Sequence, residues 1–177
     1  METLRQPTAL ISPRIDGKRT SFFEWRSAGF YRVPGQGSVF QPDALVTGLY
    51  WGFDAGRLFL RLDPVEDVGR GFGLPDARIS FELSDTERSL TGQVDLQEPS
   101  LSLHAKTRVG ATSDLGAIRE VAYDDVLELA IPLARLGLLP GDRLGLTVHF
   151  EREGTEISRV PRIGVIEVEV PADDFGE

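Results

Sequence analysis

Apolar and polar residues alternate along most of the chain, which predicts β-strands. In the segment Arg78–Leu83 every second residue is apolar, the period of a strand with one buried face. The segment Arg57–Leu62 repeats this pattern directly after Asp54-Ala55-Gly56, and such a turn sequence joins the two strands of a tight hairpin. The aromatic-rich run that begins at Leu45 and ends at this turn therefore pairs with the run that follows it.

The same pattern predicts about a dozen short strands separated by turn residues. They are Thr8–Ile11, Phe22–Trp25, Ala28–Val33, Leu45–Asp54, Arg57–Leu62, Ala77–Leu83, Arg88–Asp95, Ser100–Thr107, Ala117–Ala122, Val126–Ile131, Leu144–Glu151, Glu156–Val160 and Ile163–Val170. One helical turn at most is expected over Pro132–Leu138, because Gly137 and Pro140-Gly141 end it. We therefore expect a single all-β domain over residues 1–177, an antiparallel β-sandwich of the jelly-roll or immunoglobulin-like kind.

Composition and charge exclude several classes of partner. Apolar residues make up 41% of the 177 residues and charged residues 27%, which is typical of a globular chain. The 19 basic and 28 acidic residues give a net charge of −9, so neither nucleic acid nor an anionic membrane surface is an expected partner. The chain has no apolar stretch near the roughly 20 residues that a membrane-spanning helix needs.

Cysteine content and the first residues predict the compartment. The chain has no cysteine, so disulfides, thiol catalysis and zinc–thiolate sites are excluded. The segment Met1–Pro7 lacks the apolar core of a secretory signal. We expect a cytoplasmic protein.

Catalytic signatures are weak. The two histidines, His104 and His149, each fall in the middle of a predicted strand. Alternation places His104 on the face opposite Leu101 and Leu103, and His149 on the face of Thr147 and Glu151, so both are expected at the surface. The loop Gly69–Gly73 is rich in glycine, but no helix follows it to form a phosphate site.

Paired carboxylates are the other catalytic possibility, since glycosidases use two of them. The candidates are Glu24, Asp54, Asp63, Glu82, Asp124-Asp125 and Asp173-Asp174. Among 28 acidic residues such coincidences arise by chance, and Asp16, Asp54, Asp85 and Asp125 stand where a turn favours Asp. We expect no catalytic residue, and hence no enzyme.

A structural calcium ion is the one cofactor that stays open. The loop Asp63–Asp67 and Asp114 could supply oxygen ligands, although the chain has no Asp-x-Asp-x-Asp-Gly loop.

Aromatic residues gather in the first third of the chain and allow two interpretations. By alternation Leu49, Trp51 and Phe53 share one face with Leu45 and Thr47, whereas Val46, Tyr50 and Asp54 share the other. The first face is expected in the core, but exposed aromatic faces also stack on sugar rings. The candidate carbohydrate-binding residues are Trp25, Tyr31, Tyr50, Trp51 and Arg61.

Several phrases resemble a known family. Ile15-Asp16-Gly17, Phe23-Glu24-Trp25 and Gly52-Phe53-Asp54 resemble the C-terminal β-sandwich of glycoside hydrolase family 57 proteins. The stretch Leu127–Asp142, with Pro-Leu-x-x-Leu-Gly-Leu-x-Pro-Gly-Asp, is similar to the wider DOMON-like group, which includes carbohydrate-binding module family 9. The resemblance spans Pro7 to Phe175.

This resemblance implies a non-catalytic accessory domain, because the family's catalytic carboxylates lie in a separate (β/α) barrel. Family 9 modules clamp a sugar with two tryptophans and carry supporting Ca²⁺, but Trp25 and Trp51 are not matched to that clamp. Haem-binding relatives use Met and His ligands, and Met1 is the single methionine here, so haem is not expected. Two hypotheses remain: the domain binds an oligosaccharide such as an α-glucan, or it docks on a glycoside hydrolase catalytic domain or other partner and binds no sugar.

Overall fold

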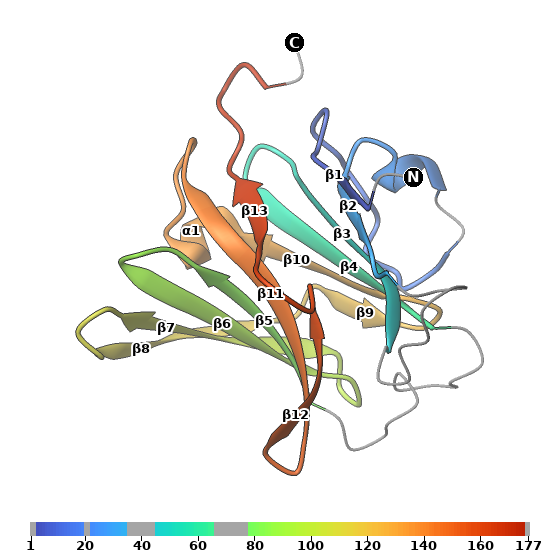
Figure 1. Ribbon diagram of the computed structural model, residues 1–177. Coiled ribbons are helices and arrows are strands. Elements are labelled where there is room, and N and C mark those ends of the chain that lie inside the picture. The colour runs from blue at the N-terminus through green and yellow to red at the C-terminus, as the bar shows by residue number, and fades with distance from the viewer. Residues whose placement is uncertain (1–2, 20–21, 35–44, 66–77, 176–177) are drawn as a thin grey trace.

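The protein is an all-β sandwich of two antiparallel sheets, as predicted (Figure 1). The structure is a computed structural model that describes residues 3–19, 22–34, 45–65 and 78–175. The six-stranded sheet has the order β1 (Leu4–Arg5), β2 (Gly29–Arg32), β3 (Val46–Phe53), β4 (Arg57–Pro64), β10 (Leu127–Pro132) and β9 (Val121–Tyr123).

The second sheet has seven strands. Its order is β12 (Thr155–Val160), β11 (Arg143–Arg152), β5 (Arg78–Ser84), β6 (Arg88–Asp95), β7 (Ser100–Thr107) and β8 (Thr112–Ile118), with β13 (Ile166–Glu169) also paired to β11. The long strand β11 pairs with β13 near its start and with β12 near its end, and with β5 along its other edge. Strand β13 therefore lies at an edge of this sheet, next to the chain's last described segment.

Helical structure is limited to two short turns in the described chain. The predicted turn after β10 is α1 (Leu133–Leu136), and it ends at Gly137, whose φ of 65° lies in the left-handed region that glycine tolerates. The 3-10 helix η1 spans Phe22–Trp25. Neither of these four-residue turns is long enough to cross a membrane.

Three sequence predictions near the strand ends are wrong. Phe22–Trp25 is η1 and not a strand, since the chain turns there and the Trp25 carbonyl accepts the Ala28 amide at 3.1 Å. Thr8–Ile11 is not a strand in the structure, although the Ile11 amide donates to the Phe53 carbonyl at 2.8 Å. The predicted strand Ala117–Ala122 is divided, because β8 belongs to one sheet and β9 to the other, so the chain crosses between the sheets at this point.

The main core lies between the two sheets. Buried side chains from β3 and β4 pack against buried side chains from β5, β7 and β11, and Trp51, Leu60, Phe81, Leu103 and Phe150 are among them. Burying side chains of this size supplies most of the favourable free energy of folding.

A β-bulge changes which residues of β3 reach this core. Leu49, Trp51 and Phe53 lie in it as alternation predicts. Val46 was expected on the opposite face but is also buried in the core. The pairing of β3 with β4 shifts between Val46 and Gly48, and one extra residue in a strand reverses the alternation on one side of the bulge.

The backbone of Gly29 lies directly against the buried ring of Trp51. A Cβ at Gly29 would lie 2.3 Å from Cε2 of Trp51, its cross-strand neighbour. We expect Gly29→Ala to lower the free energy of unfolding by about 2 kcal/mol, since the buried indole has no room to move. Urea denaturation measures this change.

The matched control is Gly56→Ala, in the exposed turn between β3 and β4, where an added Cβ meets no atom within 4 Å. We expect this variant to keep the wild-type midpoint. Equal stability of the two variants would contradict the packing argument.

Candidate functional site

A second, smaller hydrophobic cluster covers the outer face of the six-stranded sheet. The N-terminal chain, residues 11–17 and 22–28, lies over this face, and we call these residues the N-terminal cover. Its buried residues Ile11, Trp25 and Ala28 pack against Phe59 of β4 and Ala130 of β10. The structure thus buries both faces of β4 and β10.

Glu128 is the buried polar centre of this face. Its side chain lies on β10 and has no exposed surface. Its Oε2 accepts the indole N–H of Trp25 at 2.9 Å, and its Oε1 accepts the backbone N–H of Gly17 at 2.7 Å and that of Asp16 at 3.3 Å. Three donors from the N-terminal cover therefore converge on one carboxylate.

Burial raises the pKa of Glu128, and the hydrogen bonds from Trp25, Gly17 and Asp16 oppose that rise. Burying a carboxylate costs free energy unless its oxygens accept hydrogen bonds. The three donors of the cover supply these bonds, so Glu128 holds the cover in place.

The turn Asp16-Gly17 provides the backbone donors. Gly17 has a φ of 72°, and a Cβ there would lie 2.8 Å from the Asp124 backbone nitrogen. The Gly17 carbonyl accepts the amides of Asp125 and Val126, and Lys18 forms an ion pair with Asp124. Only glycine fits this contact between the cover and the turn before β10.

Arg61 is buried and paired within the sheet. Its side chain lies beside Tyr50 on the outer face, and the residue is only 6% exposed. Its guanidinium donates to both carboxylate oxygens of Asp63, at 2.7 and 3.0 Å, and its central carbon lies 4.8 Å from the centre of the Tyr50 ring. The Tyr50 ring also stands 4.5 Å from that of Phe30 and 6.1 Å from that of Trp25. This arrangement is a stacked aromatic–cation layer, partly covered from solvent.

The two tryptophans are both buried, on opposite faces of the sheet. Trp25 is 2% exposed in the outer cluster, and Trp51 is 0% exposed in the main core. The Trp51 indole nitrogen is buried without a hydrogen-bond partner, so Trp51 stabilises the fold through apolar packing. Neither indole presents a face on which a sugar could stack.

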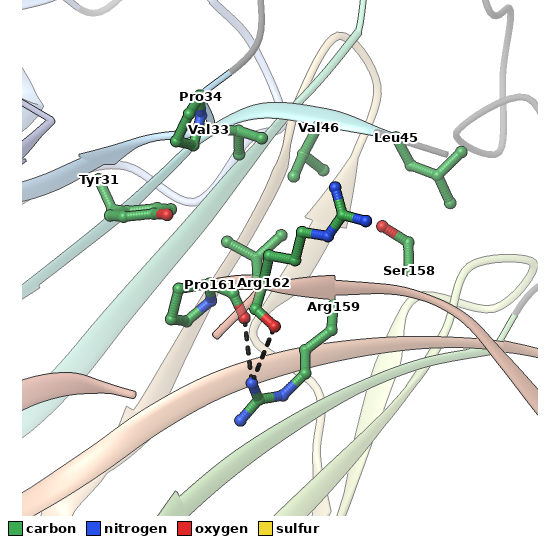
Figure 2. A pocket seen from close by; sticks show the side chains of 10 residues that line it. Tyr31, Val33, Pro34, Leu45, Val46, Ser158, Arg159, Pro161 and Arg162 are labelled. Carbon is green, nitrogen blue, oxygen red and sulfur yellow. Dashed lines mark hydrogen bonds between the residues drawn. The ribbon is translucent and has the colours of Figure 1, made fainter. Parts of the chain in front are cut away.

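Tyr31 lies apart from the other candidates, beside a small cavity between the sheets (Figure 2). Val33 and Val46 line one side of it, and Arg159 and Arg162 lie on the other. Its volume is about 30 Å³. The Arg159 guanidinium donates to carbonyl oxygens of the loop after β12, at 2.8 Å to Gly164 and 3.3 Å to Arg162, so this loop is held by that side chain.

Of the five predicted sugar-binding residues, the structure therefore gathers Trp25, Tyr50 and Arg61 on the outer face. It places Trp51 and Tyr31 on the inner face, packed against the main core. The five do not form one site.

The histidines lie where alternation places them, but only one is fully exposed. His104 is exposed as predicted. His149 shares a face with Thr147 but is half-buried rather than exposed, because its Nδ1 contacts Glu156 and its Nε2 lies 3.0 Å from Thr147 Oγ1 and 3.8 Å from Glu82. This network joins three adjacent strands on a flat sheet face.

The candidate carboxylates take part in local contacts. Asp54 accepts the Gly56 and Arg57 amides in the hairpin turn and pairs with the Arg57 side chain, and Asp63 pairs with Arg61. Glu24 accepts the Arg14 amide at 3.1 Å.

For metal binding, the described ranges hold no group of three or more His, Asp or Glu side chains that could bind an ion. Of the predicted calcium ligands, Glu66 and Asp67 lie outside the described residues, and Asp114 accepts the Gly116 amide at 2.8 Å.

Comparison of the chain with protein-family profiles, curated proteins and solved structures gave no match.

Sequence reasoning missed Glu128, although a signal exists. The run Leu127-Glu128-Leu129-Ala130-Ile131 is otherwise apolar, as in a strand buried on both faces. A single carboxylate within such a run requires buried donors from elsewhere in the chain, and the glycine turn at Asp16-Gly17 supplies two of them.

Replacing the carboxylate of Glu128 tests its role. We expect Glu128→Gln to lower the free energy of unfolding by about 1–3 kcal/mol. Both carboxylate oxygens accept hydrogen bonds from the cover, whereas the amide replaces one of these acceptors with an NH₂ donor. The control Glu120→Gln removes an exposed carboxylate that pairs with Arg57, and it should change stability by less than about 0.5 kcal/mol. Chemical denaturation of both variants measures the difference, and a silent Glu128→Gln would contradict the structural role.

The pH dependence gives an independent prediction. Because burial raises the pKa of Glu128 above its ordinary value of 4.5, the folded state binds this proton more tightly than the unfolded state does. This contribution to stability is complete below the ordinary pKa and is lost as the pH rises through the raised pKa. We expect the stability advantage of wild type over Glu128→Gln to shrink as the pH rises above the ordinary pKa of this carboxyl group. Denaturation at a series of pH values measures it, and an advantage that grows with pH would contradict the shift.

Proposed function

We propose that this domain is a non-catalytic accessory module that packs against a catalytic domain or another protein and binds no sugar. The observation that carries the proposal is that the two tryptophans expected to form a sugar platform are buried inside the fold. Trp25 and Trp51 are buried in two separate cores, and Arg61 is paired with Asp63. The family 57 glycoside hydrolase context rests on the resemblance of Ile15-Asp16-Gly17, Phe23-Glu24-Trp25 and Gly52-Phe53-Asp54. The stretch Leu127–Asp142 resembles the wider DOMON-like group.

The cavity beside Tyr31 is too small to enclose a sugar. At about 30 Å³ it has room for only one or two water molecules, so a sugar ring could not enter it. Small-molecule sites usually enclose most of their ligand in a cleft of about 300 Å³ or more.

Carbohydrate binding is the second candidate, and one observation favours it. Tyr31 is half-buried at the mouth of this cavity, and the neighbouring Arg162 is exposed. A sugar lying across the mouth could contact the ring edge and the guanidinium.

Titration calorimetry separates the two functions. We expect no heat of binding from maltooligosaccharides, glucose or cello-oligosaccharides up to ~1 mM, because both tryptophans are buried and Arg61 is paired with Asp63. We expect a separately produced (β/α) barrel of a family 57 glycoside hydrolase to bind. Saturable heat from a sugar that Tyr31→Ala abolishes would overturn the docking proposal in favour of the second candidate.

A further inference from the structure

One end of the sandwich carries two adjoining cavities of about 400 and about 300 Å³. They share Pro171 and Ala172, so the segment that follows β13 forms a ridge between them. We call the two cavities and this ridge the end surface. Figure 1 shows the parts that meet here: the C-terminal segment beyond β13, the turn between β3 and β4, and the chain around α1.

Backbone hydrogen bonds hold these parts together. The Leu133 amide donates to the Gly56 carbonyl at 2.8 Å, which ties α1 to the hairpin turn. The Val170 amide donates to Asp142 and its carbonyl accepts the Gly141 amide, both at 2.8 Å, which ties the C-terminal segment to the loop before β11. The cavities are thus formed between elements that are fixed to one another.

The cavities have apolar floors. The buried core residue Phe53 lines the larger cavity, and the buried core residues Leu138 and Val170 line the smaller. Leu10 is 44% exposed at the wall of the smaller cavity, and Phe175 is half-buried in the larger one. Apolar walls of this kind gain free energy when a partner displaces water from them.

The rim is acidic. Glu167, Glu169 and Asp174 line the larger cavity, and Asp54 and Asp173 line the smaller, while no Lys or Arg among the described residues lines either one. Asp54 at the smaller cavity is paired with Arg57 at 2.8 Å. At the larger cavity, Arg143 lies 3.9 Å from Glu167 and 3.7 Å from Glu169 through side chains that are all more than half exposed. Such exposed pairs are weak, so the rim keeps an attractive potential for cations.

The larger cavity also borders the edge of β13 that faces away from β11. On the β11 side, the Val170 amide donates to the carbonyl of Asp142, just before β11. On the other side, the Glu167 carbonyl accepts the Gln6 side-chain amide at 3.2 Å. Since alternate residues of a strand direct their backbone groups to opposite edges, the N–H and C=O of Glu169 point away from β11, as those of Glu167 do. An edge of this kind can pair with an added strand.

We propose that the end surface is the docking site for an extended segment of a partner protein in which aliphatic residues alternate with Lys or Arg. The aliphatic side chains enter the cavities, the cations meet the acidic rim, and the backbone lies along the edge of β13. This inference rests on the docking function proposed above and assigns it a surface and a partner chemistry.

Other partners fit this surface less well. An anionic lipid surface or a nucleic acid would meet five carboxylates lining the two cavities. A sugar would find apolar floors without an exposed aromatic face.

Peptide binding tests the proposal. The probe is an acetylated and amidated peptide, Lys-Val-Lys-Leu-Lys-Val-Lys, titrated into the full chain and followed by amide chemical-shift changes. We expect saturable shifts at residues 53–56, 133–140 and 167–175. Peptides with Glu in place of Lys, or with Ser in place of Val and Leu, should bind more weakly by about tenfold.

Matched charge reversals locate the site. We expect Glu167→Lys with Glu169→Lys to weaken binding of the Lys peptide by about tenfold, since the rim loses its potential and two cations repel the probe. The control pair Glu87→Lys with Glu98→Lys makes the same change in net charge at exposed positions in other turns and should leave binding unchanged. Ala172→Trp, which fills the ridge without changing charge, should also block binding while the circular dichroism spectrum stays that of a folded β-protein.

The outcomes separate this inference from the proposed function. Shifts elsewhere on the surface, equal loss in the two charge-reversed pairs, or no binding of the Lys peptide would overturn the end-surface proposal. Saturable sugar binding in calorimetry would instead overturn the docking function itself.

Discussion

The carboxylate of Glu128 is the interaction on which the outer face of the six-stranded sheet depends. It is fully buried, and its three hydrogen-bond donors all come from the N-terminal cover. If the cover moved away, the carboxylate would gain water but Trp25 and Ile11 would be exposed; if the carboxylate were lost, the cover's donors would be buried without acceptors. The hydrogen bonds to Glu128 and the burial of apolar side chains therefore act together. They hold the N-terminal cover in place, although it has little regular secondary structure of its own.

This arrangement explains why the aromatic-rich third of the chain is a poor guide to a ligand. Trp25 of the cover packs on Phe59 and Tyr50, whereas Trp51 lies in the core between the sheets, against Gly29. The two rings belong to opposite faces of one sheet, so they cannot clamp a common ligand in this fold. Both tryptophans therefore contribute to the stability of the fold.

A docking role is consistent with how the remaining surface is built. The outer face of the seven-stranded sheet carries polar side chains such as Thr147 and His149, which satisfy one another. The end surface differs, because its apolar cavities lie beside carboxylates that have few partners among the described residues. Apolar area supplies affinity and charge supplies orientation, and here the two occur together.

The amino-acid sequence by itself determined the all-β class, the hairpin of β3 and β4, and the inward faces of most strands, because alternation and turn residues are local properties. It did not show that β8 and β9 belong to different sheets, that a bulge buries Val46, or that η1 replaces a strand. It also left open whether Trp25 and Trp51 faced solvent. Only the tertiary structure decided these points, since burial of an aromatic ring and the partner of Glu128 depend on contacts between residues more than a hundred positions apart.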